Sequence, residues 1–258
     1  MGPDEKDLGQ QREQGVIKAF VHLSNELVDD YDIIDTLTTL TASCAELLDV
    51  ASAGLLLADE SSVLHLVASS SERTRELELL QLQREEGPCL DCYRSGEIVV
   101  SAGLPDMKKR WPVFSRSAEI RGFESVHALP MRLREHALGA IGLFSEGVGH
   151  LGAADLALAQ ALVHVACVAI VNNKTASDRA TINIQLQHAL NSRVVLEQAK
   201  GVIAASGELE MDVAFAVLRR YARDHGLRLS EVAAEVVGRG LPVDVLLRHG
   251  RSAAILPS

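Results

Sequence analysis

Cys89 and Cys92 form a C-x-x-C pair, the spacing in this chain that comes nearest to a chemical motif. Two thiols at this spacing serve either as a redox pair or as half of a metal site. No second C-x-x-C and no suitably spaced pair of histidines completes a set of four zinc ligands, so we predict no metal site. We interpret the two cysteines as side chains on one face of a short helix, with a redox-active Cys89 as the alternative.

Other catalytic patterns are missing from the sequence. It contains no H-E-x-x-H, no P-loop, no G-x-S-x-G and no G-x-G-x-x-G. Its many Asp and Glu residues fall in amphipathic segments, where a solvated helix face explains them. The sequence therefore predicts a protein that is not an enzyme, and it indicates no particular cofactor.

Three aromatic residues gather in one irregular excursion of the chain, at Trp111, Phe114 and Phe123. They are a large share of the aromatic side chains, because Phe, Trp and Tyr make up only 3% of the sequence. An excursion of this kind would cap a sheet, so we interpret these residues as the core of a lid. The alternative is that they line a ligand pocket, together with Cys89.

Composition and charge divide the chain into unequal parts. Its 258 residues allow one large domain or two modest ones, and its formal net charge of −10 argues against a nucleic-acid partner on average. Residues 1–180 hold 16 Lys and Arg against 27 Asp and Glu, whereas residues 181–258 hold 9 against 8. The acidic excess thus lies entirely in the front part, which suggests a division of labour.

The N-terminal segment is polar and lacks the apolar region of a signal peptide. No apolar run approaches the roughly 18 residues that a membrane span needs, and the four cysteines do not form a secreted disulfide framework. These features predict a cytoplasmic protein without a membrane partner.

The front part alternates between helical and strand patterns. Residues 11–49 give two amphipathic helices, and the acidic turn that ends at Asp32 supplies the N-cap of the second. A charged helix is expected at residues 71–86, between the second and third of five predicted strands. The predicted strands are Ala51–Ala58, Val63–Ser69, Glu97–Ser101, Glu124–Leu133 and Ala137–Ser145, and the last two flank a hairpin loop at residues 134–136.

This order of elements resembles a GAF domain. The resemblance is carried by the segments EEGPCLDCYRSGEIVV, RWPVFSRSAEIRGFESVHALPMRL and ALGAIGLFSE. It implies an α+β fold, an antiparallel sheet with flanking helices, over residues 11–171. GAF domains often bind a small molecule under a lid, so the resemblance implies an unidentified small-molecule ligand.

The C-terminal part reads as three helices over residues 186–237, preceded by a helical connector at residues 172–185. Apolar residues recur every seven positions along the first of these helices, as expected of a seam that pairs with a partner helix. Gly201 in mid-helix costs roughly 1 kcal/mol against alanine, which suggests that something approaches the backbone closely there. The predicted dimer seam is Ile182, Ala189, Leu196 and Ile203.

This part resembles an ANTAR domain, most directly in SRVVLEQAKGVI, AFAVLRRYA and LSEVAAEVV. The resemblance covers residues 186–250 and implies a homodimer that binds hairpins, and in particular tandem stem-loops, in nascent RNA and prevents transcription termination. The alternative is a DNA-binding regulator with a C-terminal helix-turn-helix, although the last helix carries few side chains that could read base edges. The residues predicted to contact RNA are Arg193, Lys200, Gly201, Arg219, Arg220 and Arg223.

Overall fold

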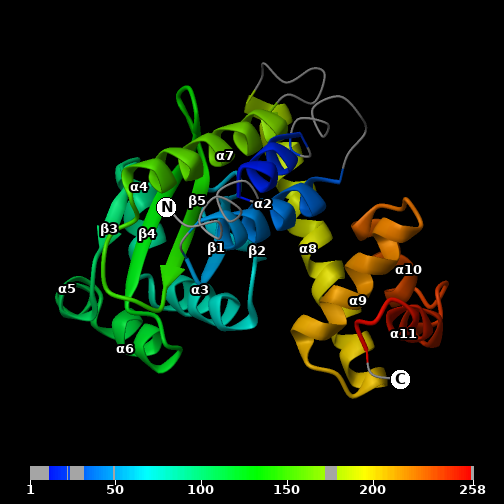
Figure 1. The fold of residues 1–258 in the computed structure, drawn as a ribbon. Coiled ribbons are helices and arrows are strands. Elements are labelled where there is room, and N and C mark those ends of the chain that lie inside the picture. The colour runs from blue at the N-terminus through cyan, green and yellow to red at the C-terminus, as the bar shows by residue number, and fades with distance from the viewer. Residues whose placement is uncertain (1–11, 22, 24–31, 49, 172–178, 257–258) are drawn as a thin grey trace. The chain divides into compact units, whose positions relative to one another are not determined.

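The structure is a computed structural model that describes residues 12–21, 23, 32–48, 50–171 and 179–256 (Figure 1). Side chains between residues 179 and 188 are described only at residue 187. The chain divides into two compact units, with the main boundary in helix α8 between Leu186 and Gln187; residues 31–35 group with the second unit.

The first unit is built on a five-stranded sheet with the strand order β2-β1-β5-β4-β3, and each pair of neighbouring strands is antiparallel. Central strands β4 and β5 form a hairpin in which Leu133 pairs with His136, close to the loop predicted from the sequence. The third strand is shorter than expected. The bounds are β1 Ser52–Ala58, β2 Leu64–Ser69, β3 Val99–Ser101, β4 Ser125–Leu133 and β5 His136–Ser145.

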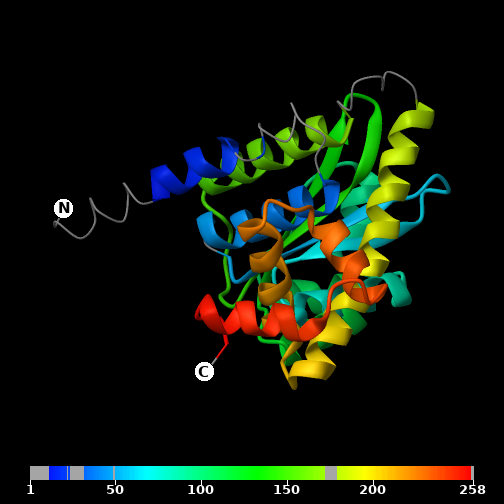
Figure 2. The same ribbon diagram turned by 90° about the vertical axis from the view of Figure 1, so that its right-hand side faces the viewer.

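Because side chains alternate along a strand, each face of this sheet has its own set of residues. Leu56, Val126 and Phe144 belong to one core cluster, which also contains Leu77 and Met107 from helices. That face is covered by four helices, and α2 and α7 lie on the other side of the sheet (Figures 1 and 2). The helices of this unit are α2 Ile33–Leu47, α3 Glu72–Arg84, α4 Pro88–Ser95, α5 Leu104–Arg110, α6 Pro112–Ile120 and α7 Ala153–Val171.

Two of these helices, α5 and α6, correct the irregular excursion expected from the sequence. Pro105 and Pro112 stand in the first turns of α5 and α6 rather than between helices. Proline is tolerated there because the first amide groups of a helix have no partner within the helix. The two prolines therefore mark the starts of helices.

The predicted N-cap of α2 is confirmed at Asp32, since Oδ1 of Asp32 accepts a hydrogen bond from the amide of Ile34 at 3.0 Å. Residues 24–31 lie outside the described residues. Of the first predicted amphipathic helix, residues 12–21 are helical.

Helix α7 corrects the expectation that no apolar run could span a membrane. Its 19 residues are long and apolar enough to do so by length and composition. In the structure one side of α7 packs on the sheet, and Leu162, Ala166 and Ile170 are fully buried. The helix is thus a core element of a globular domain. Of the helical connector predicted at residues 172–185, residues 172–178 fall outside the described residues, and the rest belongs to helix α8, which begins at Arg179.

The second unit is helical, as predicted, but it contains a fourth helix that the three-helix interpretation did not include. That helix is α11, Val243–Ser252, and it packs against α9. A Cβ at Gly250 would lie 3.0 Å from Cγ2 of Val217, so α11 approaches α9 closely at this point. The others are α8 Arg179–Gly207, α9 Met211–Asp224 and α10 Leu229–Val237.

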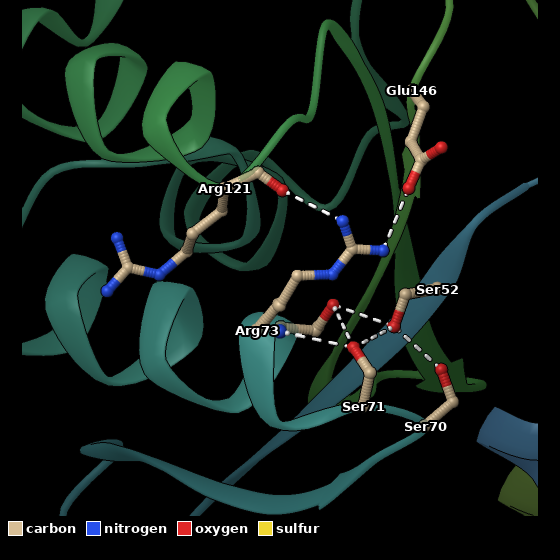
Figure 3. A network of polar contacts seen from close by, with 7 residues as sticks. Ser52, Ser70, Ser71, Arg73, Arg121 and Glu146 are labelled. Atoms are coloured by element: carbon tan, nitrogen blue, oxygen red, sulfur yellow. Dashed lines mark hydrogen bonds and ion pairs between the residues drawn. The ribbon is translucent and has the colours of Figure 1, made fainter.

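A network of hydroxyl groups attaches α3 to the sheet (Figure 3). Ser71 caps α3 by accepting from the amide of Thr74, and its Oγ lies 2.8 Å from Oγ of Ser52 on β1. The next residue but one, Arg73, donates to the carbonyl of Arg121 at 3.1 Å and to Glu146 at 2.8 Å. The start of α3 is therefore fixed to a strand, to the end of α6 and to the end of β5.

The middle of α3 carries a carboxyl group into the core. Glu78 is fully buried and lies against Gly54 of β1, where an added Cβ would come within 2.7 Å of Cγ of Glu78. Nε2 of Gln81 donates to Glu78, and Sγ of Cys89 donates to Oε1 of Glu78 at 3.5 Å. Burial raises the pKa of Glu78 to about 8, although the hydrogen bonds from Cys89 and Gln81 act in the opposite direction. Glu78 is therefore mostly protonated at neutral pH.

This buried carboxyl group predicts how the stability of the first unit depends on pH. Between about pH 4.5 and pH 8 the unfolded chain has lost the proton that folded Glu78 still holds. The free energy of unfolding should therefore fall as the pH rises through this range, by up to about 1.4 kcal/mol per pH unit, and level off above it. In Glu78→Gln this contribution should disappear, because glutamine does not ionise and its amide can donate to Cys89.

Chemical denaturation at several pH values measures this difference, with fluorescence of Trp111, the single tryptophan of the chain, as the signal. The matched control is Glu76→Gln on the same helix, since the side chain of Glu76 is half exposed and should leave the wild-type slope unchanged. Identical slopes for the wild type and Glu78→Gln would contradict the buried, protonated state of Glu78.

Candidate functional site

The residues predicted as a sensor pocket do lie together, between the sheet and helices α3 to α6. Cys89, Trp111, Phe114 and Phe123 all belong to the same buried core cluster. The rings of Trp111 and Phe114 meet edge to face with 6.1 Å between their centroids. Nε1 of Trp111 donates to Asp91 at 2.8 Å. The structure thus places them as tightly packed core, which corresponds to the lid-core interpretation.

The thiol of Cys89 is a poor nucleophile in this environment. Burial and the neighbouring carboxyl group of Glu78 raise the pKa of Cys89 well above its ordinary value, and burial raises the pKa of Cys92 to about 12. A thiol attacks as the thiolate, so both groups are unreactive in the folded state. Among the described residues, no group of three or more His, Cys, Asp or Glu side chains is placed to hold a metal ion.

A cavity that the sequence did not indicate lies at the opposite end of the sheet from the hairpin. It has a volume of about 400 Å³ and lies where β4 begins, β5 ends and α7 begins. His127 contributes to its wall: Nε2 accepts from the amide of Leu151 at 3.1 Å, and Nδ1 has no partner among the described residues. Burial and the nearby His150 lower the pKa of His127, so its ring is neutral at physiological pH. No local pattern joins these residues, because they come from different segments.

In the second unit, two of the predicted RNA contacts share one carboxylate. Glu197 accepts from Arg193 at 2.8 Å and from Nζ of Lys200 at 3.0 Å, both through Oε1. Lys200 also lies over the ring of Phe215 on α9, with 5.5 Å from Nζ to the ring centroid. Its side chain is only 6% exposed and that of Arg193 only 11%. Lys200 therefore links α8 to α9, and both cations have little surface to offer to a phosphate.

The environment of Gly201 differs from the expectation. A Cβ added at this position would have nothing within 4 Å among the described residues. Close approach of a neighbouring helix of the same chain therefore does not explain this glycine.

The three arginines of α9 differ in their exposure and in their contacts. Arg219 is about one-third exposed. Nε of Arg220 donates to Asp224 at 2.6 Å, and Arg223 is exposed in the last turn of the helix. The predicted cations thus fall into two groups, one paired with Glu197 and one at the end of α9.

The predicted dimer seam is not a free surface. Ala189, Leu196 and Ile203 are each 0% exposed in this single chain, and the side chain of Ile182 lies outside those described. Their seven-residue spacing follows the buried stripe of α8, and their contact with a partner helix stays a prediction. The large apolar side chains that α8 does expose are Val194 and Val202.

Two conserved-domain families match the chain, and their positions agree with the two units. The GAF domain model matches residues 30–171, more than half of the chain, and the ANTAR domain model matches residues 185–237. The predicted fold class, an α+β GAF-like domain followed by a helical ANTAR-like domain, is thereby confirmed. A comparison with curated proteins finds no match.

Solved structures of GAF domains resemble the chain at low sequence identity. The GAF domain/HD domain protein from Geobacter sulfurreducens is 15% identical, with 58% of this chain and 99% of that chain covered and a TM-score of 0.47. The GAF domain of the Acinetobacter phosphoenolpyruvate-protein phosphotransferase is 16% identical, with 68% and 94% covered and a TM-score of 0.45. The corresponding domain from Coxiella burnetii is 14% identical, with 59% and 91% covered and a TM-score of 0.45. The chain belongs to the GAF domain family and carries a C-terminal ANTAR domain.

Proposed function

We propose that this protein is a cytoplasmic homodimeric regulator that binds stem-loops in nascent transcripts and prevents their termination. A small molecule bound by the GAF domain controls its affinity for RNA. The observation that carries the proposal is the ANTAR match over residues 185–237, which spans α8, α9 and α10. GAF and ANTAR domains are typically not enzymes, and the buried thiols of Cys89 and Cys92 support a non-catalytic sensor.

The contacts in the second unit favour Arg220 and Arg223 as the cations that contact the phosphates of RNA. Arg223 is exposed, whereas Arg193 and Lys200 are mostly covered and paired with Glu197. The proposed RNA interface also includes the other predicted residues. Their role is to maintain the conformation of α8 and α9: Arg193, Lys200, Gly201 and Arg219.

In the DNA-binding alternative, α10 and α11 would form the helix-turn-helix, and α10 gives it little support. A helix that reads DNA presents donors and acceptors to the major groove. The exposed residues of α10 after Ser230 are instead acidic or apolar: Glu231, Ala234, Glu235 and Val237.

The GAF domain has two candidate locations for a ligand site. One is the packed core around Cys89, Trp111, Phe114 and Phe123, which would have to open. The other is the cavity of about 400 Å³ beside His127.

The first test of this proposal concerns RNA. A tandem stem-loop RNA should bind much more tightly than either single stem-loop, because the second contact of a dimer is intramolecular. Arg223→Ala should weaken binding and flatten the dependence of log affinity on log salt by about 0.7 to 0.9 per lost phosphate contact. Filter binding across a salt series measures both effects.

The matched control for this test is Arg134→Ala, which removes an exposed arginine from the β4–β5 hairpin of the other domain. Equal affinity for single and tandem RNA would rule out the two-site mode. Tighter binding to duplex DNA than to RNA would rule out the proposed function itself.

The second test concerns the dimer. The outer side of α7 is apolar and partly exposed at Leu158, Val165 and Val168, so we expect this helix to pair with its copy. Val165→Glu should shift the protein towards monomer in sedimentation, because a charge in an apolar interface is left unpaired. Glu135→Lys, a charge change on the exposed hairpin, serves as the control. A wild-type chain that sediments as a monomer at micromolar concentration would contradict the dimer.

The third test concerns the sensor. A ligand of the GAF domain should raise its unfolding temperature, seen by fluorescence of Trp111, and at about 100 times its dissociation constant should stabilise the domain by roughly 2.7 kcal/mol. The same small-molecule fraction of a cell extract should change RNA affinity, because a ligand shifts the output only if it binds two states of the protein unequally. A fraction that stabilises the domain and leaves RNA affinity unchanged would contradict sensor control.

A further inference from the structure

Three rings meet on the surface of the second unit, at the point where α9 ends. The rings of Tyr221 and His225 are stacked, with 4.0 Å between their centroids and 22° between their planes. His249, from α11, meets Tyr221 edge to face at 5.3 Å and lies 5.2 Å from His225. We call Tyr221, His225 and His249 the ring cluster.

Hydrogen bonds fix the orientation of these rings. Nδ1 of His225 lies 2.8 Å from the carbonyl oxygen of Tyr221, and because a carbonyl only accepts, Nδ1 carries the proton. Asp224 accepts from Nε2 of His249 at 3.1 Å and from Nε of Arg220 at 2.6 Å. The hydrogen bond from Arg220, and then that from His249, lowers the pKa of Asp224 and keeps it ionised. The ring cluster is therefore ordered before any partner arrives, which reduces the entropic cost of binding.

Packing between α9 and α11 does not require the ring cluster. The contact between these helices already has fully buried apolar residues in Val217, Leu218 and Leu246. Tyr221 and His249 are only partly buried, and His225 is exposed. The rings thus lie outside the core of the domain and present aromatic surface to solvent.

Exposed cations are found on both helices that form the ring cluster. They are Arg223 on α9 and Arg248 and Arg251 on α11, and Arg248 forms an ion pair with Asp244 at 2.9 Å. Two of the nine Phe, Trp and Tyr residues of the chain lie in this domain, Phe215 beneath Lys200 and Tyr221 in the ring cluster. Exposed rings among cations are the combination that binds unpaired bases of RNA, because a base stacks on the ring while cations contact its phosphates.

We propose that the ring cluster is a base-stacking subsite, in which an unpaired base from the loop of an RNA hairpin stacks on the exposed ring of His225. The inference rests on the proposed RNA-binding function and adds the residues that hold the base. Tyr221 supports the ring from behind, and Asp224 positions His249 at its edge. Arg223 supplies a phosphate contact next to the stacked base.

A double-mutant cycle between His225 and one loop base tests this subsite. The probe is a tandem stem-loop RNA selected from a pool with randomised loops by binding to the full-length chain. Removing the stacked base as an abasic nucleotide, or making His225→Ala, should each weaken binding roughly 5- to 100-fold. The two changes together should cost little more than either alone, because they remove the same contact.

Two further variants separate stacking from other effects. His225→Phe keeps an aromatic ring and should retain affinity to within about threefold, although it lacks the ring nitrogens. His225→Ala should leave the slope of log affinity against log salt unchanged, because stacking releases no counterions. His136→Ala, on the hairpin of the GAF domain, is the control, and circular dichroism confirms that each variant is folded.

Each outcome supports or overturns the inference. If the wild-type chain enriches no RNA, the proposed function and this subsite both fail. If the wild type binds the selected RNA, the proposed function stands. The subsite still fails if His225→Ala binds this RNA equally well or reduces the slope of log affinity against log salt. It also fails if the loss from His225→Ala adds to the loss from every abasic position. Equal losses in His225→Ala and His225→Phe also overturn stacking.

Discussion

Glu78 and Gln81 connect the sheet of the GAF domain to the helices on one of its faces: Glu78 packs against two glycines of the sheet, and both side chains form hydrogen bonds with Cys89 of α4. Glu78 reaches the sheet because Gly54 and Gly142 have no Cβ; at either position an added Cβ would lie within 2.8 Å of its Oε1. Oε1 of Gln81 then accepts from the amide of Cys89 at 3.1 Å and so positions the start of α4. A buried carboxyl group survives in such a place only because it is protonated and hydrogen-bonded. Its helix, α3, cannot slide along the sheet without breaking these contacts.

The same region shows which parts of the fold could be predicted from the sequence. Two short apolar segments that flank the polar loop at residues 134–136 predict β4 and β5 well, because this arrangement is typical of a hairpin. The burial of Glu78 could not be predicted, since a glutamate in a charged helix is ordinarily solvated. Only the pairing of β1 with β5 brings the two glycines together beneath it.

The surroundings of the candidate site residues were hard to predict for a related reason. Heptad spacing correctly identified a buried stripe on α8 at Leu196 and Ile203, but spacing does not specify whether the same chain or a partner buries it. The i,i+4 spacing of Arg193 and Glu197 is enough to predict their ion pair, whereas the position of Lys200 over the ring of Phe215 depends on how α8 and α9 pack. The ring cluster joins Tyr221 to His249 across 28 positions of sequence, and no local period marks such a contact.

The pairing of these cations changes what charge contributes to the proposed recognition of RNA. Arg220 leaves Asp224, and Lys200 leaves Glu197, only if a phosphate replaces the carboxylate, so each contact exchanges one anion for another. The net gain from charge is then small, which is consistent with a domain of nearly balanced charge in a chain whose overall charge is −10. Stacking carries no such exchange cost, because the exposed ring of His225 gives up only water. Discrimination between RNA structures would therefore depend on the shape of a loop and the unpaired base it presents, and duplex nucleic acid, whose bases are already stacked, would gain little from this surface.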